Sequence, residues 1–108
     1  LMKIVGVTAC PTGIAHTYIT RQRILDAAKE LNFDCKIETQ GTIGIENELT
    51  KEDIEACDVV ILAVDVKISG ENRFKGKPIV RVRITDALKN AKGLLLMIEQ
   101  KIKEREEK

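Results

Sequence analysis

The chain has 108 residues, a length typical of one domain, and its 18 basic and 17 acidic residues give a formal net charge of +1. This balance excludes a global field that would attract nucleic acid or an anionic membrane, so partners must be recognised locally. The longest apolar runs, Val59–Val64 and Leu94–Ile98, fall far short of the roughly 20 residues that span a bilayer, and no secretory signal is recognisable. We therefore expect a soluble domain without direct membrane insertion.

The first elements along the chain are predicted to be a strand, a helix and a second strand. Lys3–Thr8 is nearly continuous in β-branched and aliphatic residues, which is typical of a central strand in a parallel sheet. From Ile14 onward apolar residues recur at helical spacing, and Asn32 is a plausible C-terminal cap. The segment Cys35–Thr39 alternates apolar and charged residues, which indicates an edge strand with one face in water.

A short helix and a second central strand are predicted next. Thr50 with Asp53 three residues later resembles a capping box, which opens a helix through Cys57. Asp58–Val64 is another continuous apolar run and predicts the second central strand. The following connection, Asp65–Lys77, is expected to be a loop.

The last elements are predicted to be a second edge strand at Val80–Ile84 and a helix capped by Thr85, with Gly93 as a possible kink. Together the elements predict an α/β fold with a four-stranded parallel open sheet. Right-handed crossovers favour the strand order 2-1-3-4, with helices on both faces and a phosphate-binding loop after strand 1. Ligands of such sheets collect at the carboxyl ends of the strands, where Cys10 lies.

The three cysteines are widely spaced, without the close pairing that metal clips and dithiol redox sites use. Their odd number argues against a disulfide framework, so we expect a reducing cytoplasm and neither a metal nor another cofactor. Cys35 and Cys57 occupy apolar positions within elements and are interpreted as structural. Cys10 instead ends a strand and begins a loop.

That loop, CPTGIAHT at Cys10–Thr17, has the features of an anion site. Pro11 stiffens the turn, and Gly13 permits a positive φ angle. The free backbone N–H groups and the positive end of the following helix suit a phosphate. The predicted donors are Thr12, Gly13, Ile14, Ala15, His16 and Thr17.

A cysteine beside such a loop is predicted to be a nucleophile. Helix N-termini lower the pKa of a thiol from about 8.5 to about 3.5–7.5. The resulting Cys10 thiolate could attack phosphorus and be held as phosphocysteine without a metal. Two sets of roles stay open: His16 could donate to the phosphoryl group, orient a partner or pack over the loop, and Thr12 and Thr17 could lend hydroxyls or act only as backbone donors and caps.

Residues after the neighbouring strands are further candidates for the edge of this site. Gln40 and Gly41 follow the second strand and could line it. Asp65 follows the third and is either a site residue, whose repulsion helps release the phosphoryl group, or a solvated loop acid. The basic segment Arg73–Lys77 is either a docking patch or a solvated loop.

Three functions fit these residues. A phosphatase of low molecular weight needs an arginine six positions after its cysteine, where this chain has His16, so the loop suits passing a phosphoryl group along rather than hydrolysing it. The alternatives are such a hydrolase and a non-catalytic module that binds a phosphate or a regulatory partner.

Four blocks of sequence carry a resemblance to a known family. They are CPTGIAHT (Cys10–Thr17), ETQG (Glu38–Gly41), CDVVILA (Cys57–Ala63) and RFKGKP (Arg73–Pro78). In this order they closely resemble the IIB domain of the fructose-type phosphoenolpyruvate:sugar phosphotransferase system, and the likeness extends to about Asn90.

The resemblance implies a single IIB phosphocarrier domain over residues 1–108. Cys10 would accept a phosphoryl group from a phosphohistidine on a cytoplasmic IIA partner and pass it to a sugar, fructose or a related one, held by a membrane IIC transporter. The protein would be cytoplasmic and peripheral to the membrane through IIC. The tail from Lys92 departs from the family, which favours a free-standing subunit.

A second departure lies on the first helix. The segment Thr20–Arg23 stands where the family commonly has small residues and a glutamate. Its added positive charge is expected near the partner-facing edge, where it would favour an acidic IIA surface or a different sugar.

Overall fold

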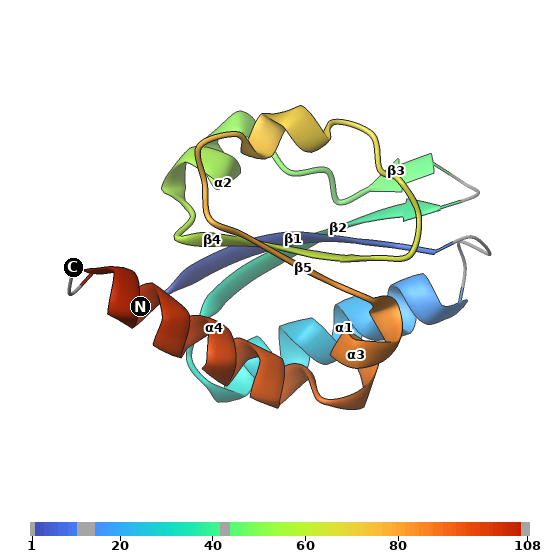
Figure 1. Ribbon diagram of the computed structural model, residues 1–108. Coiled ribbons are helices and arrows are strands. Elements are labelled where there is room, and N and C mark those ends of the chain that lie inside the picture. Colours follow the sequence, from blue (N-terminus) through green and yellow to red (C-terminus); the bar gives the residue numbers. More distant parts are fainter. Residues whose placement is uncertain (1, 11–14, 42–43, 107–108) are drawn as a thin grey trace.

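The computed structural model describes residues 2–10, 15–41 and 44–106, which form two layers of helices around one sheet (Figure 1). The elements in chain order are β1 (Lys3–Ala9), α1 (Ala15–Glu30), β2 (Asp34–Gly41), β3 (Gly44–Glu46), α2 (Lys51–Ala56), β4 (Val59–Val64), the 3-10 helix η1 (Glu71–Phe74), β5 (Ile79–Val82), α3 (Ile84–Lys89) and α4 (Ala91–Glu106).

The sheet is mixed and has five strands in the order β3-β2-β1-β4-β5. The strands β2, β1, β4 and β5 run parallel and follow the predicted order, whereas β3 pairs antiparallel with the end of β2. The prediction of a purely parallel, four-stranded sheet was therefore wrong. The three residues of β3 are too few to show an alternating pattern.

The prediction of an edge strand at Cys35–Thr39 is confirmed for most of that segment, because β3 pairs with β2 only from Thr39 onward. The polar residues of β2 do not simply face water. Lys36 Nζ lies 2.7 Å from the Asp53 carboxylate of α2, and Glu38 is fully buried. The alternation therefore reflects one polar side chain paired at the surface, Lys36, and one paired inside the protein, Glu38.

Helices cover both faces of the sheet, as predicted. Figure 1 shows α1, α3 and α4 on one face and α2 with η1 on the other. Successive strand residues enter opposite layers, so Ile4 packs with α1 and α4 while Val5 packs on the α2 side. This alternation places Cys10 and Glu38 in different layers.

Helix boundaries follow partly from local signals. The capping box is confirmed: Asp53 N–H donates to Thr50 Oγ1 (3.1 Å), and Thr50 N–H donates to Asp53 Oδ2 (2.9 Å). Asn32 has a positive φ of 60° just past α1, as a C-terminal cap should. The predicted cap at Thr85 was wrong, because α3 already begins at Ile84.

The carboxyl-terminal helical region is divided at Asn90 rather than kinked at Gly93. Asn90 leaves the helical region with a φ of −153° and ends α3, and α4 starts at Ala91. The loop predicted at Asp65–Lys77 contains η1, which is too short for a periodic pattern.

Candidate functional site

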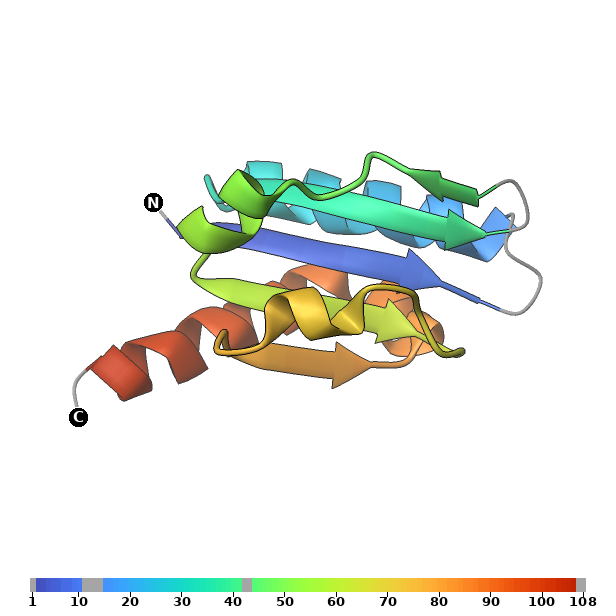
Figure 2. The same ribbon diagram turned by 90° about the horizontal axis from the view of Figure 1, so that it is seen from above.

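Cys10 lies directly after β1, at the carboxyl edge of the parallel strands. Ala9 is level with Gln40 on β2 and with Val64 on β4. Cys10, Gly41 and Asp65, the residues that follow these three, therefore lie at the same edge of the sheet. Figure 2 shows the ends of β1, β2 and β4 reaching the same edge as the start of α1.

The Cys10 side chain faces the first turn of α1. Its sulfur lies 3.2 Å from Thr17 Oγ1, and Cys10 is 7% exposed. Thr17 is fully buried, and its backbone oxygen accepts a hydrogen bond from Thr8 Oγ1 (3.1 Å). A thiolate can only accept hydrogen bonds, so in that form Thr17 Oγ1 would donate to sulfur. The positive end of α1 adds a favourable field for an anion.

The structure describes only part of the predicted phosphate loop. Pro11, Thr12, Gly13 and Ile14 lie outside the described residues, and their roles stay predictions. Ala15 and His16 open α1, and both are exposed. The Thr17 hydroxyl contacts the Cys10 sulfur, which favours the alternative in which Thr17 lends its hydroxyl to the site.

The predicted edge residues occupy the expected edge, but their side chains are engaged elsewhere. Gln40 Nε2 donates to Ser69 O (3.0 Å) and to Glu38 Oε2 (2.8 Å), in the layer opposite to Thr17. Gly41 pairs with Gly44 of β3. Asp65 Oδ1 accepts a hydrogen bond from Ile84 N–H (3.1 Å) and so caps α3.

Sequence reasoning missed Glu38, the charged residue at the centre of this edge. Its side chain is fully buried and accepts hydrogen bonds from Arg73 Nη1 (2.8 Å) and Nη2 (3.0 Å) and from Leu49 N–H (3.0 Å). Burial by itself would raise the pKa of Glu38, but the hydrogen bonds from Arg73, Gln40 and Leu49 outweigh it and lower the pKa. The only signal in the sequence was that Glu38 and Arg73 fall in two of the four recognised blocks.

Two of the three cations in the basic segment Arg73–Lys77 bind other parts of the chain, whereas Lys75 is exposed. Arg73 is committed to Glu38, and its guanidinium lies 4.8 Å from the centre of the Phe74 ring. Lys77 Nζ donates to the backbone oxygens of Glu55 (2.9 Å) and Cys57 (3.1 Å), at the end of α2. Arg73 thus connects η1 to β2, and Lys77 connects the segment after η1 to the end of α2.

Comparison with known proteins decides the family. The family model described as "PTS system, Lactose/Cellobiose specific IIB subunit" matches residues 5–104. The chain belongs to the PTS IIB family. The resemblance recognised in the four blocks is thus confirmed, and membership gives this IIB chain a phosphocarrier role in sugar phosphotransfer.

Several relatives match this IIB chain over most of their length. It is 52% identical over 99 residues to the PTS system fructose-like EIIB component 2 of Escherichia coli (strain K12), covering 92% of this chain and 93% of that protein. The fructose-like EIIB component 1 of the same strain is 39% identical over 100 residues, covering 93% of each protein. These names support a IIB chain of the fructose type.

Solved structures agree with the fold. The enzyme IIB subunit of the PTS system from Escherichia coli K12 superimposes with a TM-score of 0.91 at 37% identity, covering 97% of each chain. A domain of the fructose-specific IIABC component from Borrelia burgdorferi gives a TM-score of 0.83 at 49% identity, covering 87% of this chain and 89% of that one.

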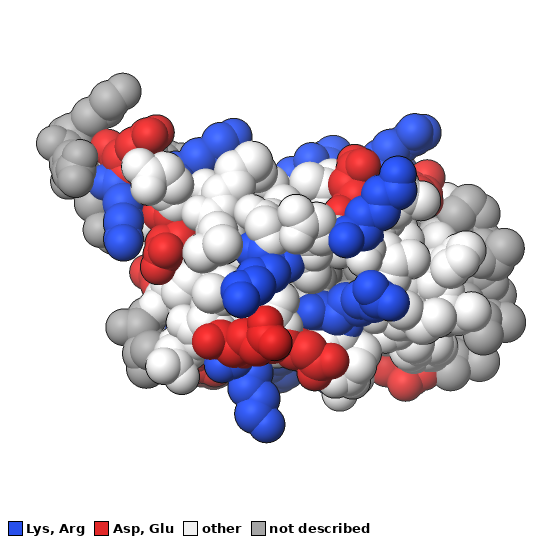
Figure 3. Space-filling view, turned by 90° about the horizontal axis from the view of Figure 1, so that it is seen from below, with Lys and Arg blue, Asp and Glu red and all other residues white. Residues whose placement is uncertain are grey.

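The added arginines of helix α1 each contact a backbone oxygen of a neighbouring element, and their role toward a partner stays a prediction. Arg21 Nε donates to Ile37 O (3.0 Å) and so ties α1 to β2 of this IIB chain. Arg23 Nη1 lies 3.4 Å from Leu88 O of α3. On the helix face in Figure 3, the described basic and acidic side chains are interspersed, and Lys92 pairs with Glu30 at 3.7 Å.

The two other cysteines are unsuited to nucleophilic chemistry. Burial, with Asp34 adding to it and Arg21 opposing, raises the pKa of Cys35 to about 12. Burial also raises the pKa of Cys57. Among the described residues, no three His, Cys, Asp or Glu side chains gather to hold a metal ion.

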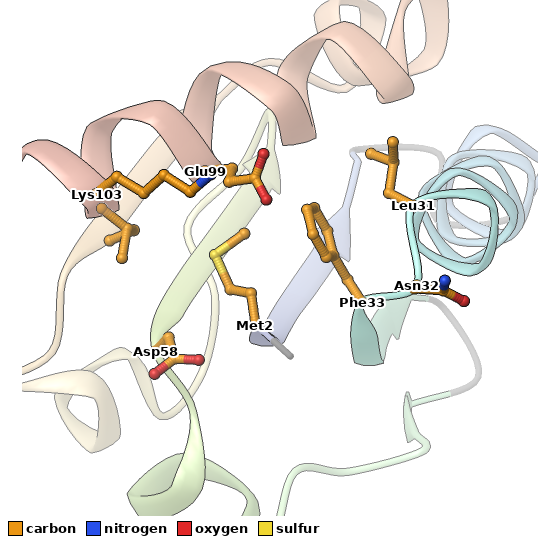
Figure 4. A pocket seen from close by; sticks show the side chains of 8 residues that line it. Met2, Leu31, Asn32, Phe33, Asp58, Glu99 and Lys103 are labelled. Carbon is orange, nitrogen blue, oxygen red and sulfur yellow. The ribbon is translucent and has the colours of Figure 1, made fainter.

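A pocket of about 490 Å³ lies at the opposite edge of the sheet from Cys10. Figure 4 shows Met2 and Phe33 at its floor, with Glu99 and Lys103 of α4 above them. It is lined by neither cysteine nor histidine. Within residues 2–10, 15–41 and 44–106, no helix is both long and apolar enough to cross a bilayer.

Proposed function

We propose that Cys10 is the residue that carries the phosphoryl group. It attacks the phosphorus of a phosphohistidine on a IIA partner, so that the N–P bond breaks as the Sγ–P bond forms. In the second step a hydroxyl oxygen of a sugar bound by a membrane IIC transporter attacks, the S–P bond breaks, the hydroxyl proton passes to solvent and the thiolate is restored. The supporting observation is the Cys10 sulfur at the end of β1, facing Thr17 at the positive end of α1.

We further propose that the sugar is fructose or a fructose-like sugar and that the protein acts in the cytoplasm, at the membrane surface through IIC. The support for the sugar is the set of fructose-like names of relatives at 52% and 39% identity. The predicted phosphate donors, residues 12–17, belong to the same proposal.

A direct test is to incubate the protein with a phosphorylated IIA protein of a fructose-type system and to map the product by mass spectrometry under conditions that preserve phosphocysteine. One phosphoryl group on Cys10 is expected, with none on a Cys10→Ser variant and normal labelling of Cys35→Ser. Labelling of Cys10→Ser at another residue would refute the assignment. A hydrolase would instead turn over an aryl phosphate, and we expect almost no turnover because His16 stands six positions after Cys10, where such a hydrolase has its arginine.

A further inference from the structure

The segment Asp65–Gly70, which we call the strap, lies at the end of β1 on the face opposite to Thr17. It leaves β4 on one side of β1 and is bonded to β2 on the other. Asp65 N–H donates to Ala9 O (3.0 Å). Ser69 then exchanges two hydrogen bonds with the Gln40 side chain, one to Oε1 (2.8 Å) and one from Nε2 (3.0 Å). The strap is therefore bonded both to the last residue of β1, next to Cys10, and through the Gln40 side chain to β2.

A buried ion pair fastens the far end of the strap. Arg73 Nε donates to Gly70 O (2.7 Å), while its two terminal nitrogens bind Glu38 on β2. Gln40 Nε2 also donates to the same carboxylate. A bidentate pair between guanidinium and a buried carboxylate has a defined geometry, and removal of one partner leaves an uncompensated charge. The strap is therefore held at one position relative to β2.

The underside of the strap packs on β1. Ile68 is buried in the same apolar cluster as Val7 and Ala9. Ala9 immediately precedes Cys10, whose sulfur meets Thr17 on the other face of the sheet. The end of β1 is thus held between the strap on one side and the first turn of α1 on the other.

We propose that Glu38, Arg73 and Gln40 are positioning residues for phosphoryl transfer, because they hold the strap at the end of β1 and so hold Cys10 against Thr17. This inference rests on the proposed function. The three side chains act through the strap and the backbone of β1, from the layer opposite to the sulfur. Displacement of a reacting atom by about 1 Å can cost about 100-fold in rate, so a loosened strap is expected to slow the chemical step.

The test is single-turnover phosphoryl transfer from phosphorylated IIA to Cys10, measured over a range of IIA concentrations. For Gln40→Ala, we expect the rate at saturating IIA to fall about tenfold or more, with little change in the half-saturating concentration. Arg73→Lys keeps the charge but loses the bidentate geometry, so its rate should also fall. The matched control is Arg81→Ala, which breaks the half-exposed pair between Arg81 of β5 and Glu71 of the 3-10 helix (2.9 Å) but leaves every bond of the strap to β1 and β2 in place, and it should keep the wild-type rate.

A second readout needs no IIA protein. The pH dependence of Cys10 alkylation by iodoacetamide should move to higher pH in Gln40→Ala and Arg73→Lys, and stay unchanged in Arg81→Ala. An unchanged rate at saturating IIA in both strap variants would overturn the inference. An increase in the half-saturating IIA concentration alone would also overturn it, because that result is expected of residues that bind IIA. If wild-type Cys10 accepts no phosphoryl group, the proposed function is wrong, but the positioning role can still be tested by alkylation. Alkylation profiles of Gln40→Ala and Arg73→Lys that match the wild-type profile would overturn the positioning role.

Discussion

The sulfur of Cys10 and the hydroxyl of Thr17 face each other at 3.2 Å across the junction between β1 and α1. Thr17 is fully buried, and Thr8 holds its backbone oxygen. A hydroxyl in this place can donate to a thiolate and can stabilise the same thiolate when it leaves phosphorus. The pair joins the nucleophile to the helix whose positive end favours an anion.

Replacement of Thr17 by valine should therefore destabilise the Cys10 thiolate relative to the thiol. A hydrogen bond to a charged group contributes about 1.5–3 kcal/mol, so the rate of phosphoryl release from Cys10 should fall roughly tenfold to 100-fold. The pH profile of Cys10 alkylation should move to higher pH, and Thr17→Ser should restore both properties. Rapid-quench transfer assays and alkylation followed by mass spectrometry measure these effects.

Thr20 provides the matched control for this prediction. It is also fully buried on α1, but its hydroxyl has no hydrogen-bond partner among the described residues. Replacement of an unsatisfied hydroxyl by a methyl group is close to neutral or stabilising, so Thr20→Val should alkylate like the wild type. Identical profiles for Thr17→Val and Thr20→Val would contradict the role of Thr17.

The cysteines should differ sharply in reactivity. Because burial raises the pKa of Cys35 to about 12 and also raises that of Cys57, both thiols remain protonated at pH 7. Iodoacetamide at that pH should therefore modify Cys10 first in the folded protein, and all three cysteines in urea. Peptide mapping over time measures the order, and labelling of Cys35 as fast as Cys10 in the folded state would refute it.

The Asp53 carboxylate that caps α2 should make the folding stability of the protein depend on pH in the acid range. Hydrogen bonds from Lys36 and from Thr50 lower the pKa of Asp53 to about 2, below its ordinary value of 3.8. The folded state therefore favours the ionised carboxylate, and this contribution is present above about pH 4 and is lost as the pH falls towards 2. Urea midpoints of wild type and Asp53→Ala should differ at pH 6 and converge near pH 2; a constant difference would exclude the linkage.

Gly6 should tolerate no side chain. A Cβ at this position of β1 would lie 2.7 Å from the backbone oxygen of Ile61 and 3.0 Å from Ile37 Cδ1. Gly6→Ala should therefore destabilise the protein by about 1–3 kcal/mol or more, measured by urea denaturation.

Gly93→Ala serves as the comparison for Gly6→Ala. There the atoms nearest to the new Cβ belong to the Asn90 side chain, which would have to move and give up its hydrogen bond from Gly93 N–H (3.0 Å). Loss of such a cap costs about 0.5–2 kcal/mol, and the preference of the helix for alanine offsets about 1 kcal/mol of it. We expect its stability to stay within about 1 kcal/mol of the wild type. Equal losses in the two variants would show that the contact with the Ile61 backbone is not the cause.

The sequence by itself determined the α/β class, the order of the four parallel strands and the position of Cys10 at a strand end. Continuous apolar runs such as Val59–Val64 report burial on both faces, and the Thr50 and Asp53 pair reports a helix start, because both signals come from neighbours along the chain. The four sequence blocks also pointed to the family.

Only the tertiary structure decided where the polar side chains of the site region belong. Glu38 looked like a residue facing water because alternation reports which face a side chain takes, and not whether an arginine 35 positions away neutralises it there. The third strand, the attachment of Arg21 to β2 and the strap held by Gln40 escaped prediction for the same reason. Each depends on groups that are distant in the chain and meet only when the sheet has formed.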